Sequence, residues 1–333
     1  MSRRSLPDQI ADGLGLLGAF AAAIKTTQTN PPELDDPLAA IADIAKLSKA
    51  HATKLAVACK PPFSSDLVAP LFAESLKMAA PMAAAVSAAD SKLAKLVVTE
   101  LKRLVANYFA SLHAFYTEIR VLAQSTEPES SSARLVTTAE LWYACDQLAA
   151  SPTTLTPSRI LAQKTKLYCD TITDAAEELS DAAAGNLDEG YDSEDGPDFV
   201  IMDGPVDAPL DESVAKDFDS LANKTAKLSI EEIPRDTMAS YAKALGLIPQ
   251  AIKTSILFLL RKKDTKPADY DTLYAHFKTI VALVDDLVAY STYQPDETEA
   301  VETAKGIVTE LKDITTLTGA STDLSEIQTN LQL

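Results

Sequence analysis

The chain has 333 residues, with 48 acidic side chains against 30 basic ones and a formal net charge of −18. This acidity argues against broad binding of nucleic acids or anionic membranes, because both require a positive surface. Apolar residues make up 47% of the chain and aromatic residues only 6%, a composition that favours closely packed helices over sheets. The length allows about two domains.

Helical periodicity, with apolar residues at steps of three and four, extends over most of the first half. It predicts helices at Leu6–Lys25, Pro37–Ala58, Asp66–Ala89, Val97–Leu122, Ala133–Ala149 and Pro157–Ala184. Asp90 or Ser91 can cap the fourth of these, which has the clearest periodicity. No alternation of period two competes with the helical pattern, so the sequence predicts an all-α fold.

The first of these helices invites a second interpretation. Arg3 and Arg4 precede the apolar run Gly13–Ile24, as in a signal peptide. Asp8 and the missing cleavage site favour a buried helix instead, and the run is too short to span a bilayer. We therefore expect no membrane association.

Two details of the next helices can be tested against the structure. In the segment Pro37–Ala58, the larger apolar residues suggest a buried stripe through Ile41, Ile44, Leu47, His51 and Leu55. In the segment Asp66–Ala89, Pro81 lies well inside the helical pattern and predicts a kink.

Most of the negative charge is concentrated in one stretch, Leu167–Ala215, which contains no Lys or Arg. Its first part continues a helix, whereas its middle combines glycine, proline and dense like charge that cannot bury a core. The sequence therefore predicts a disordered acidic linker at residues 186–209. Whether this linker regulates access to a neighbouring surface or is a passive tether is left open.

Helical patterns resume after the linker. They predict helices at Leu210–Leu228, after Pro234 to about Leu259, through Leu273–Leu287 and after Asp296 to about Ile314. Short proline-marked turns between long helices favour up-and-down antiparallel bundles. The expected organisation is an N-terminal bundle at 1–185, the linker at 186–209 and a C-terminal bundle at 210–333.

Within the linker, an apolar tetrapeptide that contains Phe199 and Ile201 lies between acidic residues. It either packs back onto a bundle or adds as a strand to the sheet edge of a partner. Ser193, followed by two acidic residues, is a weak candidate for phosphorylation by an acid-directed kinase.

No catalytic or metal-binding motif is visible. The three histidines, His51, His113 and His276, lie in helical segments without a local nucleophile signature. The cysteines Cys59 and Cys169 lack zinc-site spacing, as does Cys145, which we expect to be packed in a core rather than reactive. We expect no enzymatic activity, cofactor or metal site.

Trp142 is the only tryptophan. Leu135, Ala139, Cys145 and Ala149 share its helix face at steps of three and four. The spacing therefore predicts that Trp142 is largely buried between helices of the first bundle.

The stretch Leu135–Leu148 resembles a segment of the cyclin-D-binding protein family known as GCIP. The resemblance rests on Trp142, the pair Ala144–Cys145 and Gln147, and on the acidic segment Asp174–Leu179 about thirty residues further on. An acidic linker and a second helical half follow in the family as well.

The resemblance implies a non-enzymatic, all-helical protein of the cytoplasm and nucleus. Family members bind cyclin D and helix-loop-helix transcription factors and act as negative regulators of proliferation. Their helical bundles are similar to those of vinculin, α-catenin and talin. Trp142, Cys145 and Gln147 are family-signature residues that mark either a core or a binding site.

Two functions from different classes follow. The first is a regulator that binds helical segments of cell-cycle or transcription-regulatory proteins and inhibits or scaffolds them. The alternative is a structural adaptor of the cytoskeleton, of the vinculin–talin kind. Neither binds nucleic acid directly.

Overall fold

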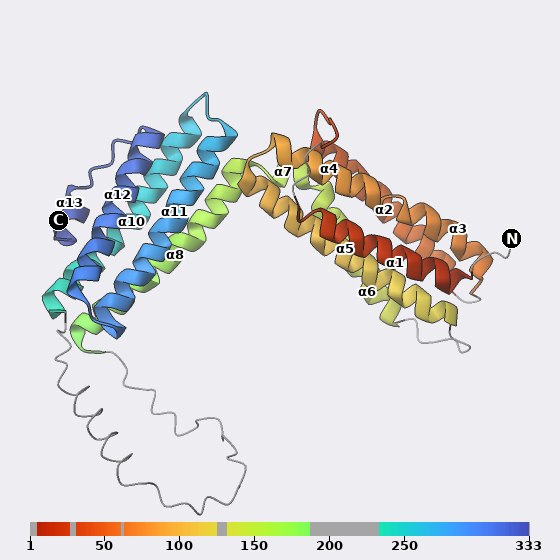
Figure 1. Ribbon diagram of the computed structural model, residues 1–333, viewed down its shortest axis with the longest axis horizontal. Helices are drawn as coiled ribbons and strands as arrows, with labels where there is room; N and C mark the ends of the chain where they lie inside the picture. The colour runs from red at the N-terminus through yellow and green to blue at the C-terminus, as the bar shows by residue number, and fades with distance from the viewer. Residues whose placement is uncertain (1–4, 27–30, 61–62, 125–131, 187–232, 333) are drawn as a thin grey trace, which may run out of the picture. The chain divides into compact units, whose positions relative to one another are not determined.

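The computed structural model describes residues 5–26, 31–60, 63–124, 132–186 and 233–332 (Figure 1). Within these ranges every regular element is a helix, which confirms the all-α prediction. The first eight helices are α1 (Leu6–Ala23), α2 (Pro37–Ala58), α3 (Ser65–Leu76), α4 (Ala79–Lys92), α5 (Lys95–Gln124), α6 (Ser132–Ala149), α7 (Ser151–Thr154) and α8 (Pro157–Ala184). They are followed by α10 (Arg235–Arg261), α11 (Pro267–Val288), the π-helical turn η1 (Ala289–Tyr293), α12 (Glu297–Thr318) and α13 (Ser325–Asn330).

Side-chain caps and prolines set several of these helix ends. Asp36 accepts a hydrogen bond from the Ala39 N–H at 3.0 Å, and Pro37 occupies the first turn of α2. Asp296 caps α12 in the same way through the N–H groups of Thr298 and Glu299. Gly319 ends α12 with φ at 72°, a left-handed conformation that favours glycine.

The segment predicted as one kinked helix forms two helices, α3 and α4, separated at Lys77 and Met78. Pro81 explains the position of the break, because it has no N–H to donate to the carbonyl of Lys77 four residues earlier. The predicted disturbance is therefore present, and the helix breaks just before the proline.

The described chain divides into two compact units. Unit 1 comprises Met1–Lys164 and Lys263–Tyr274, and unit 2 comprises Thr165–Lys262 and Ala275–Leu333. The boundary lies inside α8, near Lys164, whereas the sequence analysis placed it at residue 185. The start of α11 also belongs to unit 1, although it follows the acidic stretch by many residues.

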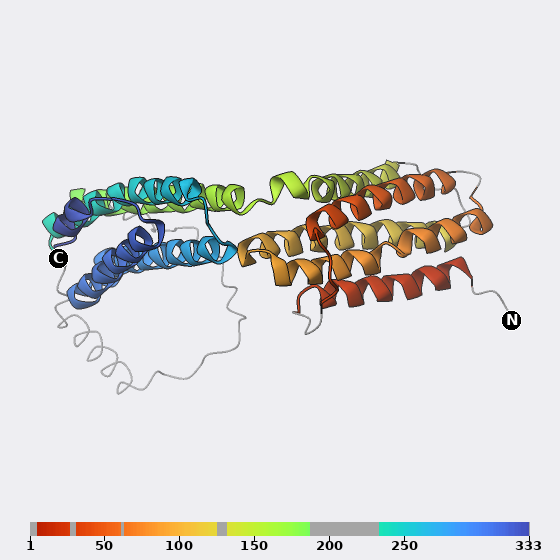
Figure 2. The ribbon, with the colours of Figure 1, turned by 90° about the horizontal axis from the view of Figure 1, so that it is seen from above.

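In unit 1 the long helices lie side by side (Figures 1 and 2), with α6 packed against both α2 and α5. Helix α5 supplies much of the core, and the predicted stripe from Val97 through Ile119 is buried. Two buried tyrosines keep hydrogen-bond partners: Tyr108 Oη donates to Ser48 Oγ at 2.9 Å, and Tyr116 Oη donates to Ser75 Oγ at 2.7 Å. These bonds satisfy polar groups that would otherwise be costly to bury.

The buried face of α2 differs in part from the expected stripe: Ile41 and Leu55 are fully buried as predicted, and Ile44 and His51 are half-buried. Ala45 and Ala52 are fully buried, whereas Leu47 is 53% exposed. Small side chains let α6 and α4 approach the axis of α2 closely, so this face is chosen by shape rather than by hydrophobicity.

Residues from far along the sequence complete unit 1. The carboxylate of Asp271 accepts hydrogen bonds from the backbone N–H groups of Lys95 and Leu96 at 2.8 and 2.9 Å. Tyr270 and Tyr274 pack partly buried against the same core. The first N–H groups of α5 have no intrahelical partners, so Asp271 acts as their cap in place of a residue nearby in sequence.

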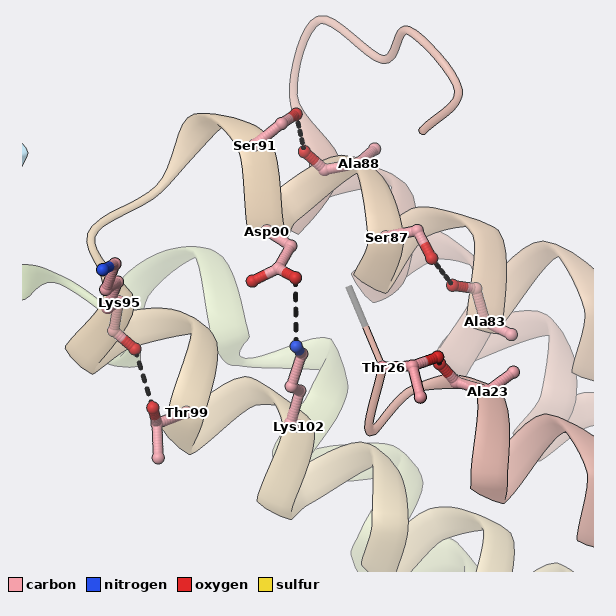
Figure 3. A network of polar contacts seen from close by, with 10 residues as sticks. All are labelled: Ala23, Thr26, Ala83, Ser87, Ala88, Asp90, Ser91, Lys95, Thr99 and Lys102. Carbon is pink, nitrogen blue, oxygen red and sulfur yellow. Dashed lines mark hydrogen bonds and ion pairs between the residues drawn. The ribbon is translucent and has the colours of Figure 1, made fainter. Parts of the chain in front are cut away.

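The sequence analysis allowed Asp90 as a cap of α5, but Asp90 has a different role in the structure. It lies in α4 and forms an ion pair with Lys102 of α5, with Nζ and Oδ2 3.1 Å apart (Figure 3). Both side chains are mostly buried, with 18% and 24% of their surfaces exposed. The pair therefore fixes α4 against α5 from inside a partly desolvated site.

In unit 2, α8, α10, α11 and α12 lie side by side (Figure 1). The predicted register of α10 is confirmed, with Tyr241, Ile248 and Ile252 fully or almost fully buried. His276 Nδ1 of α11 lies 2.6 Å from Glu310 Oε2 of α12. Helix α10 and the combined stretch Ser65–Lys92 are long and apolar enough to span a membrane, a test that apolar core helices also pass.

Candidate partner-binding surface

Helix α6 carries the residues of the sequence signature and divides them between two faces. Ala144 and Cys145 lie on its inner face with Leu141 and Leu148, and all four are buried. This face packs against α2 and α5. The Ala–Cys pair of the signature is therefore part of the core of unit 1.

The outer face of α6 exposes two aromatic residues. Trp142 is 36% exposed and Tyr143 is 66% exposed. The expectation that Trp142 is largely buried is thus wrong in degree. Trp142 follows the buried Leu141 by one residue, which rotates its side chain about 100° around the helix axis towards solvent.

Charged pairs lie beside these aromatic residues. One turn beyond Trp142, Asp146 forms an ion pair with Lys49 of α2 at 2.6 Å. Near Tyr143, Arg103 of α5 forms an ion pair with Glu100 at 2.5 Å. We call this set of six residues the α6 surface: Trp142, Tyr143, Asp146, Lys49, Glu100 and Arg103.

Hydrogen bonding shapes the electrostatics on the α5 side of the surface. The bond from Arg103 to Glu100 lowers the pKa of the Glu100 carboxyl and raises the pKa of Arg103. Tyr143 is close enough to add a smaller electrostatic contribution to the pKa of Arg103. The Glu100–Arg103 pair is therefore held charged near Tyr143.

Gln147 lies at the edge of the same surface. Its side-chain Nε2 donates a hydrogen bond to Tyr143 Oη at 2.8 Å, one helical turn away. This bond holds the Tyr143 ring along the outside of α6. The signature residues Trp142 and Gln147 thus lie on the outer side of the helix that buries Ala144 and Cys145.

The Cys145 thiol is 1% exposed, and burial raises its pKa to about 12. The thiolate is the reactive form of cysteine, so this environment suppresses nucleophilic chemistry at neutral pH. Cys59 and Cys169 are also buried.

The described residues contain no group of three or more His, Cys, Asp or Glu side chains placed to hold a metal ion. His51 is half-buried on α2 and His113 is exposed on α5. His276 pairs with Glu310, and the backbone carbonyl of His113 accepts a hydrogen bond from Thr117 Oγ1.

Three candidates from the sequence lie outside the described residues. These are Phe199 and Ile201, proposed as a docking motif, and Ser193, proposed as a phosphorylation site. The predicted linker at 186–209 and the predicted helix Leu210–Leu228 also fall almost entirely outside them.

The sequence analysis missed Tyr143 and Arg103 as surface residues beside Trp142. A signal was present for Tyr143, because it lies opposite Leu141, Ala144 and Leu148 on a helical wheel. Arg103 had no such signal, because its place beside α6 depends on how α5 packs.

A scan against protein-family models and a search of curated proteins found no match to this chain.

Proposed function

We propose that this protein is a non-enzymatic helical adaptor that binds regulatory proteins through the α6 surface. Its partners would be cell-cycle or transcription regulators of the cyclin-D or helix-loop-helix kind, which it inhibits or scaffolds in the cytoplasm and nucleus. In this proposal its helices form two up-and-down bundles joined by an acidic linker. The observation that supports the proposal is the exposure of Trp142 and Tyr143 on the helix that carries the family resemblance.

The chemistry of the surface suits protein recognition. Trp, Tyr and Arg are the residue types most enriched among residues that dominate binding energy. Here Trp142, Tyr143 and Arg103 come from adjacent helices that a buried core holds in place. Rigid aromatic side chains lose little conformational entropy when a partner covers them.

The occupant that fits best is an amphipathic helix. Its apolar face would cover the two aromatic rings, and its flanking charges would meet Lys49 and Asp146 on one side and Glu100 and Arg103 on the other. Because both flanks carry one positive and one negative group, the surface favours a partner with mixed charges over a purely basic one.

Binding to purified partners tests the proposal. Isothermal titration calorimetry would measure the affinity of the full chain for a D-type cyclin and for a helix-loop-helix domain. Replacing Trp142 and Tyr143 together by Ala should weaken binding by at least about 30-fold, the effect of removing about 2 kcal/mol of interface energy.

Leu67→Ala is the matched control, because Leu67 is a 64% exposed apolar residue of unit 1 on α3. It should leave the affinity unchanged. Unchanged affinity of the Trp142/Tyr143 variant would contradict the role of the α6 surface. Failure to bind either regulator, combined with co-sedimentation with actin or capture of actin-linked proteins, would support the cytoskeletal adaptor instead.

A further inference from the structure

Unit 2 contains a groove between α8 and α10 that no described residue fills. Its volume is about 590 Å³. Its lining includes small residues, Ala176 and Ala183 of α8 and Ala239, Ala242 and Gly246 of α10, together with the charged residues Glu177 and Lys243. We call it the α8–α10 groove.

Gly246 shows how open the groove is. A methyl group added at this position would meet no atom within 4 Å. Glycine in the middle of a helix is destabilising by roughly 1 kcal/mol relative to alanine. Close approach of another backbone would offset this cost, and nothing in the described part of unit 2 approaches Gly246.

The chain outside the described residues leaves and re-enters unit 2 beside this groove. Ala183 and Ala184 line the groove in the last turn of α8, and the description stops after Asn186. It resumes at Ile233, two residues before α10 begins. The end of α8 and the start of α10 are adjacent, because a Cβ atom added at Gly185 would lie 3.2 Å from the Arg235 guanidinium.

The sequence between these ends offers one amphipathic segment. In Leu210–Leu228 the residues Leu210, Val214, Phe218, Leu221 and Leu228 fall on one side of a helical wheel, with Asp219 and Asn223 opposite. As a helix this segment is about 28 Å long, enough to cover the groove.

We propose that Leu210–Leu228 docks in the α8–α10 groove as an additional helix of unit 2. Only four residues, 229–232, separate the segment from Ile233, so a docked helix would run antiparallel to α10 and parallel to α8. Residues 186–209 would connect the end of α8 to the start of the docked helix, and their extended reach of about 80 Å exceeds the length of the segment.

Charges on the segment agree with this direction. The docked helix brings Lys224 and Lys227 towards the end of α8 that carries Glu177 and Asp181. Its other end brings Asp211 and Glu212 towards Lys253 of α10. The proposal does not depend on the α6 surface, which lies in unit 1.

Hydrogen exchange of the full chain, followed by mass spectrometry, tests the proposal. Amides of Leu210–Leu228 should exchange slowly, by roughly 100-fold or more relative to unprotected chain. Gly246→Leu fills the groove and should remove this protection while α12 stays protected. Gly15→Leu is the matched control, because Gly15 is also a helical glycine with no atom within 4 Å of the added carbon.

A second pair of variants covers the case in which Gly246→Leu disturbs α10 itself. Phe218→Asp alters the apolar side of the segment and should abolish protection of Leu210–Leu228. Asn223→Asp adds the same charge to the opposite side and should leave protection intact. Fast exchange of the segment in the unmodified chain, or protection that survives both Gly246→Leu and Phe218→Asp, would overturn the proposal.

Discussion

Two ion pairs of unit 1 differ mainly in how far water reaches them. Asp90 and Lys102 are mostly buried, whereas Asp43 and Lys46 are 73% and 64% exposed. Removing one partner of a buried pair leaves a charge without compensation, while an exposed pair contributes little. We expect Asp90→Asn to lower the free energy of unfolding by about 2 kcal/mol and Asp43→Asn by less than about 0.5 kcal/mol. Urea denaturation of both variants measures the difference, and equal losses would contradict this account.

The Cys145 thiol gives a prediction about pH. Its pKa is raised from 9.0 to about 12 in the folded chain, chiefly by burial. Between these values the unfolded chain loses the thiol proton and the folded chain keeps it, so stability falls as pH rises through this range. At pH 8 a thiol reagent should therefore label Cys145 only after denaturation. Rapid labelling of Cys145 under native conditions, read out by peptide mass spectrometry, would show that the thiol is accessible.

At this scale the sequence identified helix α6 and the burial of Cys145 but misplaced Trp142. The spacing rule grouped Trp142 with Ala139, Cys145 and Ala149, of which Ala139 is exposed, Cys145 is buried and Ala149 is half-buried. A rotation of one residue decides whether an aromatic ring becomes core or surface. The positions of α2 and α5 around α6 determine whether the Trp142 ring lies in the core or at the surface. The periodicity of α6 alone does not reveal where these neighbouring helices lie.

Among the elements, α2 shows how packing overrides hydrophobicity. Ala45 is fully buried and Leu47 is 53% exposed, although leucine is the larger apolar residue. We expect Ala45→Leu to destabilise unit 1 by about 1–3 kcal/mol through overpacking. Leu47→Ala should change stability by less than about 0.5 kcal/mol. Thermal unfolding of the two variants tests this order, and the reverse order would restore the stripe predicted from sequence.

The boundaries of long helices were more predictable than their faces. Helices α2 and α8 begin and end at the residues that proline and cap signals indicated. The short elements α7, η1 and α13 were not predicted, because four to six residues carry too little periodicity. The division of α3 from α4 required knowing that Pro81 breaks the helix before it rather than bending it.

At the scale of the whole molecule, unit 1 depends on residues after the acidic stretch. A fragment of residues 1–185 would lack Asp271, Tyr270 and Tyr274. We expect it to be less stable than unit 1 in the full chain by about 2–3 kcal/mol, from one lost cap and the lost packing of two partly buried tyrosines. Asp271→Ala in the full chain should reproduce about 1 kcal/mol of this loss.

Asp264→Ala is the control for Asp271→Ala. Asp264 is an exposed acid in the same region, so its replacement removes the same charge. It should not change the unfolding midpoint of unit 1. A fragment 1–185 as stable as the full chain would show that the start of α11 contributes nothing to unit 1. This contribution could not be predicted from the sequence, because a cap between residues so far apart leaves no local pattern.

The cap on α5 also sets an order of events during protein synthesis. Lys95 donates to a carboxylate 176 residues later in the chain. At about 5–20 residues per second, the ribosome needs roughly 9–35 s to reach that partner after it has added Lys95, the first residue of α5. During this interval the first amides of α5 must bind water or a chaperone. Unit 1 of a growing chain is therefore an open intermediate, and ribosome-bound chains that stop before residue 271 should be cut by protease near Lys95 more readily than chains that extend past it.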